Sequence, residues 1–137
     1  MIIATSLQRL NLESGDVVKY ISKNSSFYSG FGEVYFSHVL PNSTKGWKQH
    51  RLMTMNLTVV VGVVKFVFYS SDFSSYQSFV IDESTPRLLT VKPGYWFAFK
   101  CISDNEAIIC NFSDIVHDES EISRLPLSSL FFPLENL

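Results

Sequence analysis

Residues 57–69, which read LTVVVGVVKFVFY, decide the fold. β-Branched and aromatic residues favour strands, and Gly62 divides the stretch into two runs that are apolar on both faces. We therefore predict two strands in the middle of the sheets, with a turn at Gly62 between them. The stretch is roughly two-thirds of the length that a membrane-spanning helix needs, and it contains Lys65. It is predicted to be core rather than a membrane segment.

Further strands are expected on both sides of this stretch, because β-branched and aromatic runs recur about every 8 to 12 residues between turn residues. The segments 24–32 and 118–124 are predicted as a loop and as one or two helical turns. This spacing is typical of an all-β sandwich or barrel, formed by residues 1–137 as a single domain. The predicted strands are Val17–Ser22, Glu33–Val39, Thr44–Trp47, Thr54–Val61, Val63–Ser70, Gln77–Ile81, Arg87–Val91, Trp96–Ile102 and Glu106–Phe112.

Composition restricts the class of protein. The chain has 137 residues, of which 46% are hydrophobic and 18% charged, so it is an ordered domain rather than a disordered tail or a coiled coil. A formal net charge of −2 argues against nucleic acid or an anionic membrane as the main partner. The amino terminus lacks the charged and apolar blocks of a secretion signal, so we expect a cytoplasmic protein.

Two cysteines, Cys101 and Cys110, are too few for a disulfide framework. They flank a predicted turn at Asp104-Asn105, so we expect a hairpin that brings the two thiols near each other. Their neighbours are apolar, which is typical of buried thiols rather than nucleophiles.

A short cationic stretch is the first sign of chemistry. Residues 45–51 read KGWKQHR in an otherwise acidic chain. Side chains alternate along a strand, so Lys48 and His50 should share one face while Trp47 and Gln49 share the other. Facing the interior, Lys48 and His50 would meet an anionic or carbonyl-bearing ligand. The alternative is a solvated edge strand whose lysines discourage aggregation.

Five spaced motifs follow one another between about residues 30 and 125. They are Gly32-Glu33-Val34-Tyr35-Phe36-Ser37, Lys45-Gly46-Trp47-Lys48-Gln49-His50, Met55-Asn56-Leu57-Thr58-Val59 with Gly62, Pro93-Gly94-Tyr95-Trp96-Phe97, and His117-Asp118 before Glu121-Ile122. Their order resembles that of the cupin proteins related to dTDP-4-dehydrorhamnose 3,5-epimerase. The resemblance implies a double-stranded β-helix, or jelly roll, usually a homodimer, that takes a nucleotide-linked sugar for deoxysugar or surface-polysaccharide synthesis.

The resemblance also locates the positions of a cupin metal site. The four positions that carry ligands in metal-dependent cupins correspond to Lys48, His50, Met55 and Phe97. One imidazole beside a lysine and a thioether does not make a site for a divalent first-row metal. We expect no metal and no cofactor.

Matched to the epimerases, the catalytic positions have changed. The family's arginine corresponds to Lys45 and its catalytic base to Lys48, a lysine whose pKa neighbouring Lys45 and Arg51 would lower. The family's acid tyrosine corresponds to Val116 when Glu121 is matched to the family's glutamate. The aspartate that orients the family's histidine lies in a carboxyl-terminal extension that this chain does not appear to share.

Several residues still suit a binding site. Lys48 and His50 are candidate bases and His117 a candidate acid. The candidate substrate-binding residues are Lys45, Arg51, Asn56, Tyr95 and Trp96, which offer cations, an amide and rings for stacking. Each has a structural alternative: His50 as a core histidine, Asn56 as a strand-start cap, Tyr95 and Trp96 as sandwich core, and His117 as a surface residue.

Three functions remain open. The first is an isomerase or 3,5-epimerase-like enzyme with altered catalytic residues, acting without metal on a dTDP-linked 4-keto-6-deoxyhexose. The second is a catalytically degenerate cupin that binds a nucleotide sugar or glycan without turnover. The third is a structural partner of a larger sugar-modifying enzyme, with Phe131 and Phe132 packing on another subunit.

Overall fold

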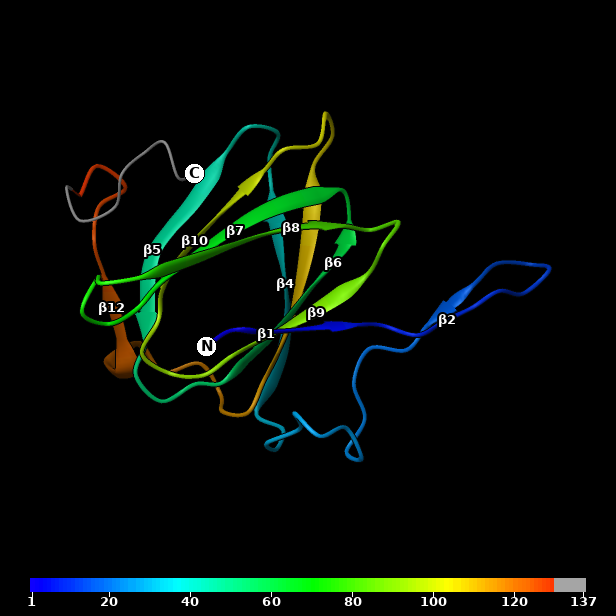
Figure 1. The fold of residues 1–137 in the computed structure, drawn as a ribbon, viewed down its shortest axis with the longest axis horizontal. Helices are drawn as coiled ribbons and strands as arrows, with labels where there is room; N and C mark the ends of the chain where they lie inside the picture. Colours follow the sequence, from blue (N-terminus) through cyan, green and yellow to red (C-terminus); the bar gives the residue numbers. More distant parts are fainter. Residues whose placement is uncertain (130–137) are drawn as a thin grey trace.

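A computed structural model describes residues 1–129 of the chain, and nearly all of its regular structure is strand (Figure 1). Phe131 and Phe132 lie outside the described residues. The strands are β1 (Ile3–Ser6), β2 (Arg9–Leu10), β3 (Val17–Val18), β4 (Glu33–Val39), β5 (Thr44–His50), β6 (Met55–Val61), β7 (Val63–Tyr69), β8 (Tyr76–Asp82), β9 (Arg87–Val91), β10 (Trp96–Cys101), β11 (Ala107–Ser113) and β12 (Ile122–Arg124), and a 3₁₀ turn, Glu119–Glu121, precedes β12.

Two five-stranded antiparallel sheets form a sandwich. The first sheet has the order β1-β9-β6-β11-β4 and the second the order β12-β5-β10-β7-β8, while β2 and β3 pair as a separate hairpin that projects from the body (Figure 1). This confirms the predicted all-β, cupin-like jelly roll. β6 and β7 lie inside different sheets, and Gly62 turns the chain from one to the other with φ +85°.

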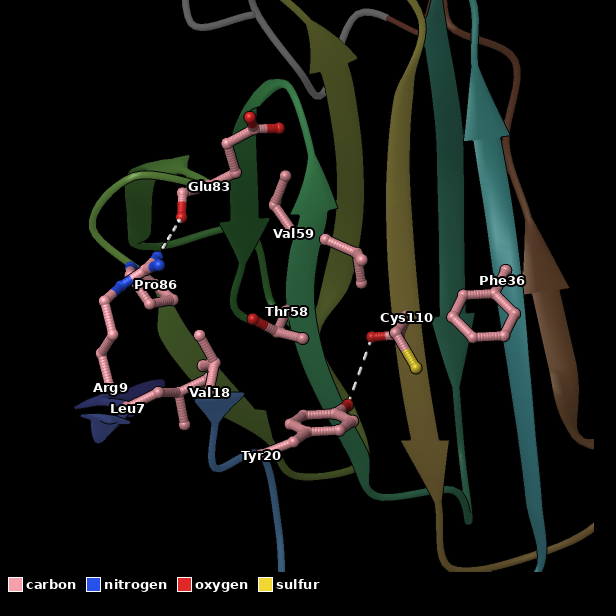
Figure 2. A pocket seen from close by; sticks show the side chains of 11 residues that line it. Leu7, Arg9, Val18, Tyr20, Phe36, Thr58, Val59, Glu83, Pro86 and Cys110 are labelled. Atoms are coloured by element: carbon pink, nitrogen blue, oxygen red, sulfur yellow. Dashed lines mark hydrogen bonds between the residues drawn. The ribbon is translucent and has the colours of Figure 1, made fainter. Parts of the chain in front are cut away.

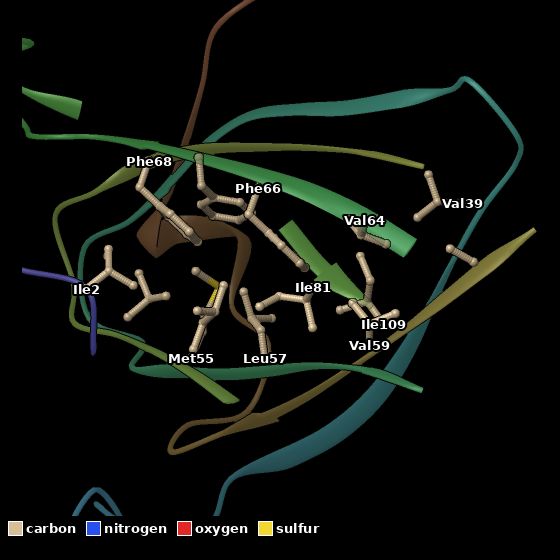
Figure 3. Packing of buried hydrophobic residues seen from close by; sticks show 14 of the residues in the cluster. Ile2, Val39, Met55, Leu57, Val59, Val64, Phe66, Phe68, Ile81 and Ile109 are labelled. Carbon is tan, nitrogen blue, oxygen red and sulfur yellow. The ribbon is translucent and has the colours of Figure 1, made fainter. Parts of the chain in front are cut away.

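The core lies between the sheets and explains why residues 63–69 are apolar on both faces. Val64, Phe66 and Phe68 of β7 point toward Met55 and Leu57 of β6 (Figure 3). Val67 and Tyr69 point the other way, into a second buried cluster with Trp47, Trp96 and Ala98. Because both faces of β7 are covered, apolar side chains are buried on either face, and the strand has no need of alternating polar residues.

The predicted strands largely match those observed, with the following main differences. β5 continues to His50 instead of ending at Trp47, and the predicted strand 17–22 is shortened to β3. The sequence does not predict β1, β2 and β12, because such short segments carry little periodic signal. The predicted helical turns at 118–124 are the single 3₁₀ turn, after which the chain pairs with β5 as β12.

The predicted hairpin around Asp104-Asn105 is wrong. β10 pairs with β5 and β7, whereas β11 pairs with β4 and β6, so the two arms enter different sheets. Cys101 and Cys110 are free, buried thiols on these two sheets rather than hairpin neighbours.

Candidate functional site

A cavity of about 230 Å³ lies between the two sheets. Its walls come from inward-facing side chains of six strands and from the segment before the 3₁₀ turn. β4, an edge strand of the first sheet, and β12, an edge strand of the second, both contribute to it. The lining residues are Glu33, Tyr35, Ser37, Lys48, His50, Met55, Leu57, Phe97, Phe99, Ile109, Asn111, His117 and Ile122.

The three predicted catalytic residues all line this cavity. Lys48 and His50 reach it from β5, and His117 from the loop after β11. The predicted alternation along β5 is confirmed, because Trp47 is fully buried on the opposite face of the sheet. The alternative of a solvated edge strand is wrong, because β5 lies between β12 and β10.

His50 forms a buried pair with Glu121. The imidazole is 5% exposed and Glu121 is 3% exposed, and Nδ1 of the ring contacts Oε1 of the carboxylate. The other oxygen, Oε2, accepts hydrogen bonds from the backbone N–H groups of Arg51 at 2.8 Å and Leu52 at 3.0 Å. Burial raises the pKa of Glu121. The imidazole of His50 and the two backbone N–H groups lower it, and together they leave the pKa below its usual range.

An ionised Glu121 fixes the tautomer of the histidine. A carboxylate only accepts hydrogen bonds, so Nδ1 of His50 must donate, and in the neutral ring Nε2 is then the nitrogen that accepts. The ring also stacks on Phe97, with centroids 5.8 Å apart and planes 12° from parallel. Glu121 thus provides a carboxylate that orients the imidazole of His50, a role that the sequence analysis does not assign to it. No local signal in the sequence could have paired two residues that are 71 positions apart.

Lys48 is half-buried beside His50. Burial lowers the pKa of its ammonium group, and the charges of Arg124 and Lys45 lower it further, against an opposing effect of Glu119. Lys45 therefore lowers the pKa of Lys48, as the sequence predicts. The second charge that lowers this pKa is that of Arg124 and not, as predicted, that of Arg51. The guanidinium of Arg51 instead donates to the backbone carbonyls of Ser120 and Glu121.

Tyr35 and Asn111 are cavity residues that the sequence analysis missed. The hydroxyl oxygen of Tyr35 accepts a hydrogen bond from Nδ2 of Asn111 at 2.9 Å. Burial raises the pKa of Tyr35, Asn111 opposes this effect, and the negative charges of Glu33 and Glu121 add to it, so the net shift is upward. The phenol is therefore protonated at neutral pH and able to donate.

The carboxyl-terminal side of the cavity is more open. Val116, at the position of the family's acid tyrosine, is 63% exposed, and its aliphatic side chain cannot act as an acid. His117, next to it, is also exposed, and its Nε2 lies 3.0 Å from Oε1 of Glu119.

The five predicted substrate-binding residues lie outside this cavity. Asn56 points to the outer face of β6, where its side-chain oxygen accepts from Thr90 at 2.9 Å. Trp96 belongs to the second buried cluster and is 8% exposed, so the core alternative describes it correctly. Tyr95 packs against the main core and its hydroxyl contacts the amino terminus. Lys45 donates to the carbonyl of His38 at 2.6 Å, and Arg51 is held as described above.

The donor set does not suit a metal. All four positions of the cupin metal pattern line the cavity, and they carry Lys48, His50, Met55 and Phe97. Across residues 1–129, no three His, Cys, Asp or Glu side chains gather in a metal-binding arrangement. Within the same residues no helix has the length and apolarity to cross a membrane.

A larger hollow of about 470 Å³ lies on the outer face of the first sheet (Figure 2). Leu7, Val18 and Phe36 make much of its wall apolar, and Tyr20 donates to the backbone carbonyl of Cys110 at 3.3 Å within it. None of the predicted catalytic residues lines this hollow. The cavity between the sheets is therefore the candidate active site.

Comparison with known proteins agrees with this geometry. No family model and no curated protein sequence matches the chain. Among solved structures, a dTDP sugar isomerase from Desulfovibrio desulfuricans G20 is 33% identical, with a TM-score of 0.90 over 96% of this chain and 88% of that one. RmlC from Legionella pneumophila Philadelphia 1, a dTDP-6-deoxy-D-glucose-3,5-epimerase, is 12% identical (TM-score 0.82, 93% and 73% covered).

A third similar structure is the 3,4-ketoisomerase QdtA from Thermoanaerobacterium thermosaccharolyticum. It is 14% identical, with a TM-score of 0.77 over 90% of this chain and 87% of that one. The two more distant structures share the fold, whereas the Desulfovibrio protein is also related in sequence, at 33% identity over 88% of its length. The chain belongs to the RmlC-like family of dTDP-sugar isomerases and epimerases.

Proposed function

We propose that this protein isomerises or epimerises a dTDP-linked 4-keto-6-deoxyhexose by enolisation, with His50 as the base. The observation that carries the proposal is the buried pair of His50 and Glu121 in the same cavity as Lys48. A carboxylate that holds an imidazole in one tautomer leaves its second nitrogen ready to accept a proton. His50 is therefore preferred over Lys48, the other candidate base.

The first step is removal of a carbon-bound proton next to the ketone. Nε2 of His50 takes the proton, and the electron pair of the broken C–H bond moves onto the ketone oxygen as an enolate. The ammonium of Lys48, on the same strand and facing the same cavity, stabilises that negative charge. The charge of the imidazolium is balanced in turn by Glu121.

The second step returns a proton to carbon. Two side chains of the cavity can donate it: Tyr35 from the opposite sheet and His117 from the loop after β11. Return at the same carbon on the other face inverts that centre. Return at the former carbonyl carbon moves the ketone, because the hydroxyl proton of the first carbon then passes to the enolate oxygen, leaving a ketone at the first carbon and a hydroxyl at the second. The reaction needs no metal in this proposal, because the cation at the enolate is Lys48.

The size of the cavity supports a ligand that is only partly enclosed by it, such as a nucleotide sugar. The cavity volume of 230 Å³ is below the range of about 300–1,000 Å³ that encloses drug-sized ligands. The sugar ring would occupy the cavity, and the nucleotide would lie at its mouth. We also infer, from the family resemblance, a cytoplasmic single-domain enzyme of deoxysugar or surface-polysaccharide synthesis that acts as a homodimer.

Proton NMR in deuterated water tests the reaction. With dTDP-4-keto-6-deoxyglucose, the wild-type protein should replace the hydrogen at sugar carbon 3 or 5 with deuterium. His50→Asn should slow this exchange by at least about 100-fold. His38→Asn is a matched control, because His38 is an exposed histidine paired with Glu106 outside the cavity. Line broadening of the thymidine signals without exchange would contradict the proposal and favour a binding module.

A further inference from the structure

Asn111 is a polar residue in the middle of an apolar strand. β11 reads AIICNFS, and asparagine is among the residues that strands disfavour. The side chain is nevertheless 1% exposed, and it lines the cavity between the sheets. Burying an amide costs free energy unless its polar groups are hydrogen-bonded. The role of Asn111 therefore depends on the partners of its amide.

The amide of Asn111 has partners for both its oxygen and its nitrogen. Oδ1 accepts a hydrogen bond from the backbone N–H of Asn56 at 3.1 Å, and Nδ2 donates to the hydroxyl oxygen of Tyr35 at 2.9 Å. The sulfur of Met53, a weak acceptor, lies 3.9 Å from the same Nδ2. A flipped amide would set its NH₂ group against the N–H of Asn56, where neither group can accept. The contact with Asn56 thus fixes the orientation of the amide and the direction of its bond to Tyr35.

The hydroxyl of Tyr35 accepts from Asn111 and cannot give its own proton to the same N–H group. Among the residues that the structure describes, Asn111 is the one hydrogen-bond partner of this hydroxyl. The two residues lie directly opposite each other in the register of β4 and β11, and both line the cavity. The phenolic proton is therefore available to a ligand in the cavity.

The same contact favours the phenolate that remains after the proton has left. The N–H of Asn111 lowers the pKa of Tyr35, against burial and the negative charges of Glu33 and Glu121, which raise it. A donor that is already in place when negative charge develops on an oxygen lowers the barrier to proton transfer.

We propose that Asn111 is a positioning residue: it holds the hydroxyl oxygen of Tyr35 as an acceptor and thereby turns the phenolic proton into the cavity. That this proton goes to the sugar rests on the proposed function. Asn56, whose side chain the sequence analysis assigned to the substrate, contributes to the site through its backbone N–H, which orients Asn111.

Asn111→Asp tests the direction of the hydrogen bond. The carboxylate keeps an oxygen for the N–H of Asn56 but offers only acceptors to Tyr35, so the phenolic proton should turn away from the cavity. Product formation should fall by about 10-fold or more relative to deuterium exchange at the carbon attacked by His50. In a Tyr35→Phe background, the same change should lower this ratio no further.

Asn56→Asp is the matched control. Asn56 is also 1% exposed and lies on the neighbouring strand, but its side chain is on the outer face of β6 and bonds to Thr90. This variant should lose stability and keep the wild-type ratio of product formation to exchange. A wild-type ratio in Asn111→Asp, or an equal fall in both variants, would overturn the proposal.

The pKa of Tyr35 in the free protein tests the contact without any reaction. Asn111→Leu should raise this pKa by about one pH unit or more, because the phenolate loses its N–H donor. Fluorine NMR of protein labelled with 3-fluorotyrosine follows the titration, and Tyr35→Phe assigns the signal. An unchanged or lowered pKa in Asn111→Leu would overturn the proposal. Failure of the wild type to exchange substrate hydrogens while the pKa still rises in Asn111→Leu would overturn the reaction and leave the contact of Asn111 with Tyr35 standing.

Discussion

At the scale of single residues, the proposed chemistry depends on groups that reach the cavity from opposite sheets. His50 and Lys48 come from β5 of the second sheet, and Tyr35 comes from β4 of the first. A base and an acid placed on opposite walls would contact opposite faces of a sugar ring. Inversion of a carbon centre requires this arrangement.

Tyr35→Phe should separate the two proton transfers. Product formation should fall by about 100-fold or more, while deuterium exchange at the carbon attacked by His50 should persist. Comparing the rate of product formation with the rate of exchange by NMR measures the separation. A wild-type rate of product formation in Tyr35→Phe would show that His117 returns the proton.

Tyr20→Phe is the matched control for this variant. Tyr20 is another half-buried tyrosine with a raised pKa, but it lies on the outer face of the first sheet. Its hydroxyl binds the backbone of Asn56, Cys110 and Phe112. Removing it should cost stability and leave the ratio of exchange to product formation unchanged.

At the scale of elements, β5 carries the site and Gly46 lets it pack against β10. Gly46 has φ +148°, and a Cβ there would lie 2.5 Å from Cβ of Ala98 and 2.8 Å from its Cα. The register between β5 and β10 shifts between Phe97 and Phe99, next to this contact. The shift places both Lys45 and Lys48 opposite cavity-facing phenylalanines.

Gly46→Ala should therefore destabilise the fold by about 2–4 kcal/mol, through backbone strain together with overpacking against Ala98. Gly94→Ala isolates the strain, because Gly94 also has a positive φ of +101° but has nothing within 4 Å of an added Cβ. It should cost about 1 kcal/mol. Urea denaturation measures both free energies of unfolding, and equal losses would contradict the role of close packing at Gly46.

The sequence predicts these elements well where a strand is long and apolar, and poorly where pairing partners decide the structure. β4 and β9 have the predicted bounds, and Lys48 and His50 share the predicted face. By contrast, β12 forms because residues 122–124 pair with the edge of β5, and the composition of these three residues does not indicate a strand. The pairing of Glu121 with His50 has no local signal either, because the two residues are 71 positions apart.

At the scale of the whole molecule, the outer face of the first sheet is the surface that suits a second copy. Phe36 is 60% exposed and Val60 is 49% exposed beside the open hollow. The β2–β3 hairpin projects beyond the body (Figure 1), and its Leu10 and Val17 are exposed. We expect this face to form the interface of the proposed homodimer.

Phe36→Asp should convert a dimer into monomers, because it places a charge in an apolar interface. Sedimentation velocity across a concentration range measures the change. Val80→Asp is a control on β8 of the other sheet, where Val80 is 48% exposed, and it should leave the assembly unchanged. A wild-type protein that stays monomeric at high concentration would contradict the proposed interface.

The central claim is that His50 and Glu121 act as one unit, and a double-mutant cycle on deuterium exchange tests it most directly. Glu121→Gln keeps an acceptor oxygen but not the charge, so exchange should slow by about 10-fold or more. Adding this change to His50→Asn should slow exchange no further, because the group that Glu121 orients is already absent. Exchange at the wild-type rate in Glu121→Gln, or full additivity of the two changes, would contradict the account.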